Sequence, residues 1–421
     1  MAKLKIGICG WGNVATGLYE QLVNDVQKYP EWEISCIGAR RDNPRCNPGL
    51  IKVLRDIFAV VDEDIDVLVE LIGGVNTAKD LIAQALNSGK HVVTANKAVI
   101  FEHGEELIEL AQQNNVNLLF ESAVCAGTPI IKLLSNELNA NKIYKVAGML
   151  NGTTNFILSN MEEGASYESV LHEAQELGYA EPDPSLDVNG TDAAHKIGIL
   201  SALAFNSGLP VSDFHIEGIE NIQPQDFTYA HDSNLTVKHL AVAKLSDQGI
   251  ELRSHPVMLS KDVSLAGLKG VRNGIQFDTD LLGEFHVAGS GAGRESTASG
   301  LISDLLALSK SNKTSPIRYP DFSKKPNILN FSDLIFKYYL YLEVKGEPDP
   351  EVSALITKIS ADHKVSFDKV IQKDWLDNSA NIVPLVVFTE PIVESKMQII
   401  LQDLEDHPLI LNSKIIRIEE L

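Results

Sequence analysis

The segment 181–196 places several carboxylates beside one lysine. Its acids crowd into a turn and the start of an expected helix, and they are Glu181, Asp183, Asp187 and Asp192. Lys196 follows Asp192 by four positions, so both side chains share one face of a helix expected over 192–206. The acids can hold an ammonium group while the lysine reaches a carboxylate or carbonyl oxygen. This pattern indicates a site for a small zwitterionic substrate; the alternative is a capping cluster with an exposed ion pair, which stabilises little.

A glycine-rich turn near the N-terminus indicates a dinucleotide site. An apolar strand is expected over 3–9, and Gly10, Gly12 and Ala15 then keep the G-x-G-x-x-G/A spacing ahead of an amphipathic helix. The glycines let the backbone turn and approach a pyrophosphate at the helix start. A second strand, expected over 32–38, favours a Rossmann-type α/β domain over a merely structural turn. The cofactor positions expected in this loop are Gly10, Gly12, Asn13 and Val14.

The end of the second strand indicates which dinucleotide binds. NAD sites usually place an acid there for the ribose 2′-hydroxyl, whereas this chain has Arg40 and Arg41. Guanidinium groups suit a 2′-phosphate. We therefore expect NADP, with NAD also usable, and Asp42 is close enough to be the alternative acid.

The composition argues against several classes of partner. A chain of 421 residues implies two or three domains, and its net charge of −21 argues against nucleic acid or an anionic membrane. No apolar run reaches membrane-spanning length, and the first residues enter a strand at once, which leaves no room for a signal peptide. The four cysteines lack zinc-site spacing. Together these features predict a protein of the reducing cytoplasm.

Strands and helices alternate through the first part of the chain. Strands are expected over 66–71, 91–94 and 117–120, and helices over 78–88 and 105–114. Sites in parallel sheets gather at the carboxyl ends of strands. The residues at these ends are Gly73, Gly74, Thr94, Asn96, Lys97, Glu121 and Ser122. We expect Lys97 to be functional rather than merely solvated, because Asn96 arrives with it at the same crevice.

The remaining chain predicts two further units. The middle unit has helices expected over 166–177, 192–206, 235–245 and 297–308, with strand-like runs near Ile250, Val263 and Ile275. The stretch G-S-G-A-G-R-E-S-T-A-S opens the last helix and forms an anion-friendly nest, and a polar linker follows over 309–323. The final unit has strands expected over 338–344, 367–372, 383–389 and 414–419, with helices over 351–362 and 393–404. Their order, β-α-β-β-α-β, is that of a ferredoxin-like fold.

Six motifs in order resemble the homoserine dehydrogenase family from Ile6 to about Leu308. They are G-W-G-N-V-A-T-G, E-L-I-G-G, G-K-H-V-V-T-A-N-K, G-M-L-N-G-T-T-N-F-I-L, the acidic segment ending in D-A-A-H-K, and G-S-G-A-G-R-E-S-T-A-S. The resemblance implies an NAD(P)-dependent oxidoreductase that interconverts L-homoserine and L-aspartate 4-semialdehyde, at a branch toward threonine, methionine and isoleucine. It implies an NAD(P)-binding domain over 1–128, with helix 297–308 packed back on it, and an α+β catalytic and dimerisation domain over 129–325 in a homodimer or homotetramer.

The same resemblance assigns roles to single residues. Lys196 and Lys97 match the family's active-site lysines, candidates for proton transfer to the developing alkoxide and for holding substrate. The implied substrate positions are Glu181, Asp187, Asp192, Asn151, Gly152 and Thr153. The further cofactor positions are Gly73, Thr94, Lys97, Ser122 and Gly291. A monovalent cation, usually sodium, is implied at Glu121, Val124, Ala126 and Thr128, with Cys125 a neutral replacement for the family's Ala or Gly.

The final unit, 338–421, resembles an ACT regulatory domain but departs from it at the ligand-binding turn. Glu351 stands where a glycine is expected, and Glu347 and Asp349 add charge. Like charges should repel an amino-acid carboxylate, so we expect weak or absent threonine inhibition and a role mainly in assembly. Two alternatives to the main function stay open: a non-catalytic regulator that binds NADP or an amino acid, and a dehydrogenase for a related semialdehyde.

Overall fold

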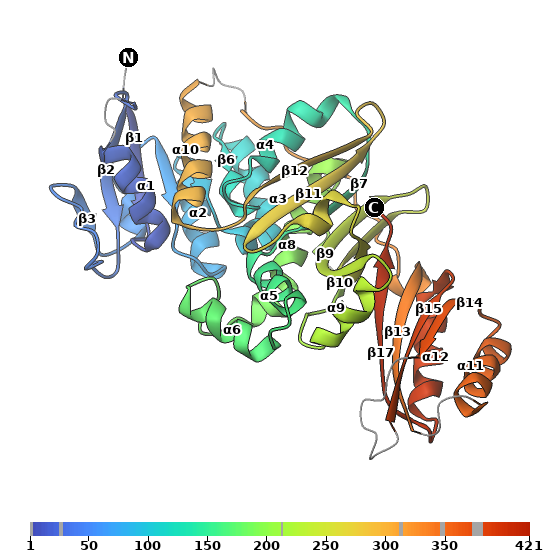
Figure 1. The fold of residues 1–421 in the computed structure, drawn as a ribbon. Coiled ribbons are helices and arrows are strands. Elements are labelled where there is room, and N and C mark those ends of the chain that lie inside the picture. Colours follow the sequence, from blue (N-terminus) through green and yellow to red (C-terminus); the bar gives the residue numbers. More distant parts are fainter. Residues whose placement is uncertain (1–2, 25–27, 212–213, 311–314, 346–349, 373–381) are drawn as a thin grey trace.

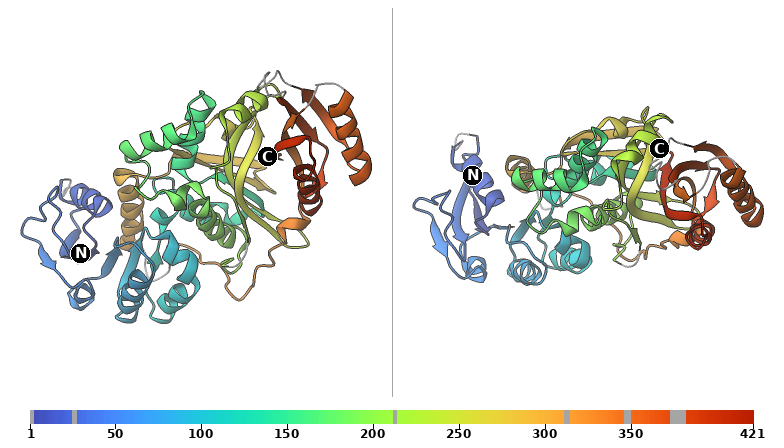
Figure 2. Two further views of the ribbon diagram at one scale, coloured as in Figure 1. Left: turned by 90° about the horizontal axis from the view of Figure 1, so that it is seen from below. Right: turned by 60° about the horizontal axis from the view of Figure 1, so that its bottom comes forward.

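The structure is a computed structural model that describes residues 3–24, 28–211, 214–310, 315–345, 350–372 and 382–421; the side chains of 350–353 and 355 lie outside the described set. Three regions lie in a row, with the N-terminal domain at one end and the C-terminal segment at the other (Figure 1, Figure 2). No helix in the described ranges is long and apolar enough to cross a membrane.

The N-terminal region contains a six-stranded parallel sheet in the order β3-β2-β1-β4-β5-β6. Its strands are β1 (Leu4–Cys9), β2 (Trp32–Gly38), β3 (Lys52–Leu54), β4 (Val67–Glu70), β5 (His91–Thr94) and β6 (Leu118–Leu119). Its helices are α1 (Asn13–Asn24), α2 (Asn76–Asn87) and α3 (Lys97–Gln113), with 3-10 turns η1 (Phe58–Asp62) and η2 (Glu121–Ala123). The predicted Rossmann-type sheet is confirmed. Because the strand order reverses between β1 and β4, their carboxyl ends open a crevice for a ligand.

Helix α3 begins eight residues earlier than the helix expected over 105–114. Asn96 caps it, because the Asn96 side chain accepts a hydrogen bond from the backbone N–H of Val99. Lys97 therefore stands in the first turn of a helix rather than in a loop. The sequence-based expectation missed this start because the first turns of α3 lack a clear apolar period.

The other strands of the described chain join one mixed sheet, ordered β12-β11-β7-β9-β10-β17-β13-β15-β14, with β8 beside β10 and β16 beside β13. The strands of its middle region are β7 (Ile143–Met149), β8 (His215–Ile216), β9 (Leu235–Leu245), β10 (Ile250–Ser260), β11 (Arg272–Thr279) and β12 (Glu284–Ser290). The helices of that region are α4 (Ile130–Ser135), α5 (Gly152–Glu162), α6 (Tyr167–Glu176), α7 (Ser185–Val188), α8 (Thr191–Phe205), α9 (Pro224–His231) and α10 (Arg294–Lys310), with 3-10 turns η3 (Glu137–Ala140) and η4 (Ser264–Gly267).

The helix predicted over 235–245 is wrong, because these residues form strand β9. β9 pairs with both β7 and β10, and its side chains from Thr236 to Ala243 are buried. A strand covered on both faces has a nearly continuous apolar sequence, which periodicity cannot distinguish from a buried helix. The strand-like run near Val263 is also wrong, since β10 ends at Ser260 and the 3-10 turn η4 follows.

Helix α10 lies against the N-terminal region although it is distant in sequence. A Cβ on Gly17 of α1 would lie 2.6 Å from Cγ of Arg294, so the two helices pack closely there. Arg294 forms an ion pair with Glu20 of α1, and farther along the helix Asp304 accepts a hydrogen bond from the backbone N–H of Glu121. The start and the interior of α10 therefore both contact the region that carries the parallel sheet.

The C-terminal segment has the predicted order of strands and helices. Its elements are η5 (Phe331–Asp333), β13 (Ile335–Lys345), α11 (Pro350–His363), β14 (Phe367–Gln372), β15 (Ile382–Thr389), β16 (Ile392–Val393), α12 (Glu394–Glu405) and β17 (Ile410–Glu419). The acidic turn expected to govern threonine binding lies outside the residues whose side chains are described, because it comprises Glu347, Asp349 and Glu351.

This segment has a hydrophobic core of its own, and its last strand also joins the central sheet. β17 runs parallel to β10 with Val257 opposite Arg417, and antiparallel to β13. Tyr338 of β13 packs in a core with α11 and α12, whereas Tyr339 packs with Ile157 of α5 on the other face. The sequence did not predict the pairing of β17 with β10, because strand pairing across a sheet edge leaves no local signal in the sequence.

Buried charges lie where β17 meets the middle region. Arg417, which is 3% exposed, donates to both carboxylate oxygens of Glu394 on α12 at 2.7 and 2.8 Å and to Glu217 at 2.7 Å. Arg253 of β10 pairs with Glu419 of β17 at 2.9 Å. Charges this deeply buried are tolerated only when they are paired and hydrogen-bonded.

We expect Arg417→Met to lower the free energy of unfolding by about 3–5 kcal/mol, because Glu394 would lose its buried cationic partner. The matched control is Lys337→Met on β13, which removes an exposed ion pair with Glu420 and should change stability by about 0–1 kcal/mol. Urea unfolding measures both variants. Equal losses would contradict a structural role for the buried cluster.

Candidate active site

A groove of about 590 Å³ opens at the carboxyl ends of β1 and β4, where the strand order reverses. It is lined by Gly10, Trp11, Gly12, Gly38, Ala39, Arg40, Arg41, Asp42, Asn43, Pro44, Ile57, Leu71, Ile72, Gly73 and Thr77. Five of the residues predicted to bind the cofactor lie here together: Gly10, Gly12, Arg40, Arg41 and Gly73.

The two glycines of the first turn have different surroundings. Gly10 has φ +103°, and a Cβ there would lie 2.4 Å from the carbonyl oxygen of Leu71, so no other residue fits without displacing the backbone. A Cβ on Gly12 would meet nothing among the described atoms within 4 Å. The backbone at Gly12 is therefore open toward the groove, at the start of α1, where a pyrophosphate can approach free N–H groups.

Charged side chains gather at the mouth of the groove. Arg40 and Arg41 are exposed at its mouth. Asp42, the alternative ligand for a ribose hydroxyl, is ion-paired with Arg55 at 2.7 Å. Arg55 also donates to the carbonyl oxygen of Ala39 at 3.4 Å, so a third guanidinium stands beside the end of β2.

The other predicted cofactor positions lie outside this groove: Asn13, Val14, Thr94, Lys97, Ser122 and Gly291. Thr94 is buried and donates to the carboxylate of Glu70 at 2.6 Å, and Ser122 donates to the carbonyl oxygen of Thr297 at 2.8 Å. Glu70 also accepts from the backbone N–H of Ile72. The side chains of Thr94 and Ser122 therefore hold the protein's own loops.

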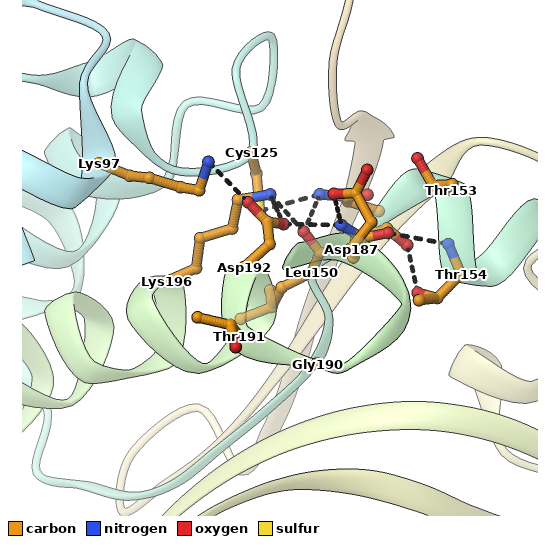
Figure 3. Close-up of polar contacts among 12 residues, drawn as sticks. Lys97, Cys125, Leu150, Thr153, Thr154, Asp187, Gly190, Thr191, Asp192 and Lys196 are labelled. Carbon is orange, nitrogen blue, oxygen red and sulfur yellow. Dashed lines mark hydrogen bonds and ion pairs between the residues drawn. The ribbon is translucent and has the colours of Figure 1, made fainter. Parts of the chain in front are cut away.

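Two lysines from distant elements share one carboxylate (Figure 3). Nζ of Lys97 at the start of α3 lies 2.8 Å from Oδ1 of Asp192, and Nζ of Lys196 lies 2.7 Å from Oδ2. Asp192 and Lys196 are buried on α8, while the side chain of Lys97 is one-third exposed. Asn96, the neighbour of Lys97, donates to the carbonyl oxygen of Gly74 at 2.7 Å. This hydrogen bond links the start of α3 to the loop after β4, whose Gly73 lines the groove.

Mutual pairing keeps this cluster ionised despite its burial. Burial acts to raise the pKa of Asp192, but the two lysines outweigh it and hold that pKa well below its usual range. Burial acts to lower the pKa of Lys196, and the Asp192 carboxylate more than offsets this, so the pKa is raised. The ammonium of Lys196 is therefore available at neutral pH as a proton donor or a cationic contact.

The neighbouring helix α5 adds an amide and a second carboxylate. Asn151 caps α5 and donates through Nδ2 to Asp187 at 2.7 Å and to Asp192 at 2.8 Å. Burial raises the pKa of Asp187. Thr153 donates instead to the carbonyl oxygen of Tyr179 at 2.6 Å, and a Cβ on Gly152 would lie 2.9 Å from the carbonyl oxygen of Val271. Asn151, Asp187 and Asp192 thus meet, whereas Gly152 and Thr153 shape the helix start.

Glu181 does not join this cluster. Its side chain is exposed, and its backbone carbonyl accepts from Gln175. Of the acids in the segment 181–196, the structure therefore brings Asp192 to Lys196 and leaves Glu181 outside the cluster.

One carbonyl oxygen connects Lys196 to a residue that the sequence analysis missed. The Leu150 carbonyl accepts from Nζ of Lys196 at 2.6 Å and from Nδ2 of Asn273 at 2.9 Å. The same Nδ2 lies 3.3 Å from Sγ of Cys125, which is buried with φ +54°. Asn273 belongs to a strand sequence without a recognisable motif, so the sequence did not indicate that it contacts the site.

The loop 121–128, where a cation is expected, is largely buried, and its Glu121 carboxylate already accepts hydrogen bonds from the protein. Glu121 accepts the backbone N–H groups of Ile131 at 2.8 Å and Lys132 at 3.0 Å, which begin helix α4. Burial, with Asp304 nearby, raises the pKa of Glu121 to about 7. Lys132 pairs with Asp304 at 2.7 Å. No group of three or more His, Cys, Asp or Glu side chains suited to a metal occurs in the described ranges.

Residues of the loop still fit a monovalent cation in part. Val124, Ala126 and Thr128 supply backbone carbonyls from a chain that turns back through Cys125 and Ala126, both with positive φ. Each carboxylate oxygen of Glu121 accepts one backbone N–H, and Nζ of Lys132 lies 3.9 Å from Oε2. Oxygen donors of this kind suit hard cations.

The fold and the lysine cluster together define a dinucleotide-dependent dehydrogenase. A groove for a dinucleotide opens at the carboxyl ends of the parallel strands, and Lys97, which follows β5, meets the same carboxylate as the buried ammonium of Lys196. An ammonium stabilises the negative charge that develops on an oxygen during carbonyl reduction.

Comparison with known proteins gives the family. The family profiles described as "Homoserine dehydrogenase, NAD binding domain" and "Homoserine dehydrogenase" match residues 10–121 and 129–306. Homoserine dehydrogenase of Pseudomonas aeruginosa is 37% identical over 409 residues, 94% of each chain. The chain therefore belongs to the homoserine dehydrogenase family, and the predicted function, NAD(P)-dependent interconversion of L-homoserine and L-aspartate 4-semialdehyde, is confirmed.

Solved structures agree with this assignment. The crystal structure of a homoserine dehydrogenase from Thiobacillus denitrificans superposes with a TM-score of 0.90 at 35% identity and covers 100% of this chain and 99% of its own. A hyperthermophilic archaeal homoserine dehydrogenase in complex with NADPH has a TM-score of 0.61 at 28% identity and covers 74% of this chain and 100% of its own.

Proposed function

We propose that the reaction takes place at the cluster of Lys97, Asp192 and Lys196. The observation that carries this proposal is one buried carboxylate held between two lysines, next to the dinucleotide groove. A bound nicotinamide supplies hydride to the aldehyde or accepts it from the alcohol. Lys196 holds a proton at Nζ for the reacting oxygen and stabilises the charge that develops there.

The remaining groups bind the amino-acid end of the substrate. Asp187 offers a carboxylate to the ammonium group, and Asn151 fixes its direction by donating to it. The exposed Glu181 is proposed to reach the same ammonium from the neighbouring turn. Lys97 is partly exposed and can meet the substrate's carboxylate without leaving Asp192.

Two observations disfavour the alternatives left open by the sequence. A non-catalytic regulator has no need of two lysines on one buried carboxylate, yet the structure assembles both lysines on Asp192. A dehydrogenase for a related semialdehyde would differ in the pocket, and relatives that cover 94% of the chain carry the homoserine dehydrogenase name.

We expect Lys196→Met to lower the rate of NADPH oxidation with L-aspartate 4-semialdehyde by about a hundredfold or more, because the group for proton transfer is lost. NADPH should still bind, since Lys196 lies outside the groove, and Asp192 keeps Lys97 as its partner. The control is Lys269→Ala, which breaks an exposed ion pair with Glu163. A Lys196 variant that works within a few-fold of the parent would refute the assignment.

NADP is the proposed preferred cofactor, with NAD usable. Support comes from the exposed guanidinium groups of Arg40 and Arg41 at the groove and from the engagement of Asp42 by Arg55. A 2′-phosphate would receive charge-assisted hydrogen bonds there.

Replacing Arg40 and Arg41 with alanine should weaken NADPH binding by about 1–3 kcal/mol and leave NADH nearly unchanged, since only NADPH has the 2′-phosphate. Arg45→Ala, an exposed arginine nearby that does not line the groove, is the control. Dissociation constants for both nucleotides decide the matter. Equal losses for NADPH and NADH would remove the basis for an NADP preference.

The loop from Glu121 to Thr128 is proposed to hold a monovalent cation, most simply sodium. Support comes from the buried carboxylate of Glu121 and from the backbone carbonyl groups that Val124, Ala126 and Thr128 offer in a chain of positive φ at Cys125 and Ala126. The rate should rise as sodium replaces a bulky organic cation at constant ionic strength, and Glu121→Gln should weaken that response by removing the negative charge. If the rate of the parent enzyme does not change with sodium, the proposal that this loop binds sodium is refuted.

The C-terminal segment is proposed to be an ACT-like unit that acts mainly in assembly of a homodimer or homotetramer. Support comes from its β-α-β-β-α-β order and from the continuation of the central sheet through β17. The expectation of weak threonine binding rests on its acidic turn and stays a prediction.

A further inference from the structure

We propose that Asn273 is a positioning residue for the reaction: its side-chain amide fixes the Leu150 carbonyl, and that carbonyl fixes the ammonium of Lys196. This inference rests on the proposed role of Lys196. It concerns a residue of β11 that donates to the same carbonyl oxygen as Lys196 of α8.

The Leu150 carbonyl needs a partner that regular structure does not provide. The register of β7 with β11 ends at Met149 opposite Gly274, and α5 is capped by Asn151. Leu150 lies between the end of the β7–β11 pairing and the start of α5. Its peptide group is therefore oriented neither by strand pairing nor by helical hydrogen bonds. Two side chains donate to its oxygen, Lys196 at 2.6 Å and Asn273 at 2.9 Å.

Of these two donors, Asn273 is the one that can hold the peptide in place. Its backbone is fixed in β11 between β7 and β12, where Asn273 is opposite Gly289. The side chain is fully buried, and the missing Cβ of Gly291 would lie 2.1 Å from Oδ1 of Asn273. The close approach of Gly291 on one side leaves the amide facing Leu150 on the other.

The ammonium group of Lys196, by contrast, needs a second contact to hold it in place. Its stem has four rotatable bonds, and its carboxylate partner Asp192 is shared with Lys97. The Leu150 carbonyl is the second point that holds the ammonium. Small displacements of a reacting group reduce rates steeply, so loss of this point should affect turnover more than binding.

Asn273 has a matched control in Asn155 of α5. Both amides are buried, each donates to a backbone carbonyl, and Oδ1 of each has no hydrogen-bond partner among the described residues. Asn155 donates to Arg272 at 3.2 Å, whose carbonyl receives nothing from Lys196. Comparison of Asn273→Leu with Asn155→Leu therefore separates loss of a buried amide from loss of the contact to Leu150.

We expect Asn273→Leu to lower kcat by about tenfold or more with the KM for NADPH unchanged, because the misplaced group is the ammonium and not the groove. Thermal unfolding should be shifted no more than in Asn155→Leu, since Leu150 keeps Lys196 as a donor and an unsatisfied Oδ1 is removed. Asn155→Leu should keep its kcat. Asn273→Asp, equal in size but without the Nδ2 donor, is the second variant if leucine prevents folding.

The decisive measurement is the double variant with Lys196→Met. If Asn273 acts through Lys196, adding Asn273→Leu to Lys196→Met should cause no further loss, whereas independent effects multiply. Multiplying losses, an unchanged kcat, or a raised KM for NADPH would overturn the inference; the last would assign Asn273 to the Gly291 loop. If kcat falls in Lys196→Met but not in Asn273→Leu, only this inference is refuted. If kcat does not fall in Lys196→Met, the proposed function is refuted as well.

Discussion

The central constraint in this protein is the buried carboxylate of Asp192. A carboxylate this deep requires compensation, and it receives two cations from different regions: Lys97 from the helix that follows β5 and Lys196 from α8. The same contact therefore holds the dinucleotide-binding region to the middle region and sets the charge of the active site. Asn151 and the Leu150 carbonyl complete the arrangement from the end of β7.

Contacts distant in sequence place this cluster. Helix α10 returns to pack on α1, and Asp304 within it receives the backbone N–H of Glu121. At the other end, β17 extends the sheet that carries the active-site strands, with Arg417 buried between Glu217 and Glu394. The middle region is thus joined to the N-terminal region through α10 and to the C-terminal segment through β17.

Much of the chemistry was predictable because it follows local rules. The spacing of Gly10 and Gly12 gave the dinucleotide turn, and the spacing of Asp192 and Lys196 gave their ion pair. The structure brought Lys97 to the same carboxylate but left Glu181 exposed outside it. Strand β9 was misread as a helix, because a strand buried on both faces has no two-residue alternation.

The sequence alone determined the family, the parallel sheet and the residue types of the site, since motifs and periodicity depend on residues that are close together along the chain. Tertiary structure alone decided which partners these residues meet. Asn273, Arg55 and Asp304 carry no motif, yet they contact Leu150, Asp42 and Glu121 because distant strands and helices bring them there. Pairing across a sheet edge, such as β17 with β10, depends on backbone groups that every residue has, so the sequence could not show it.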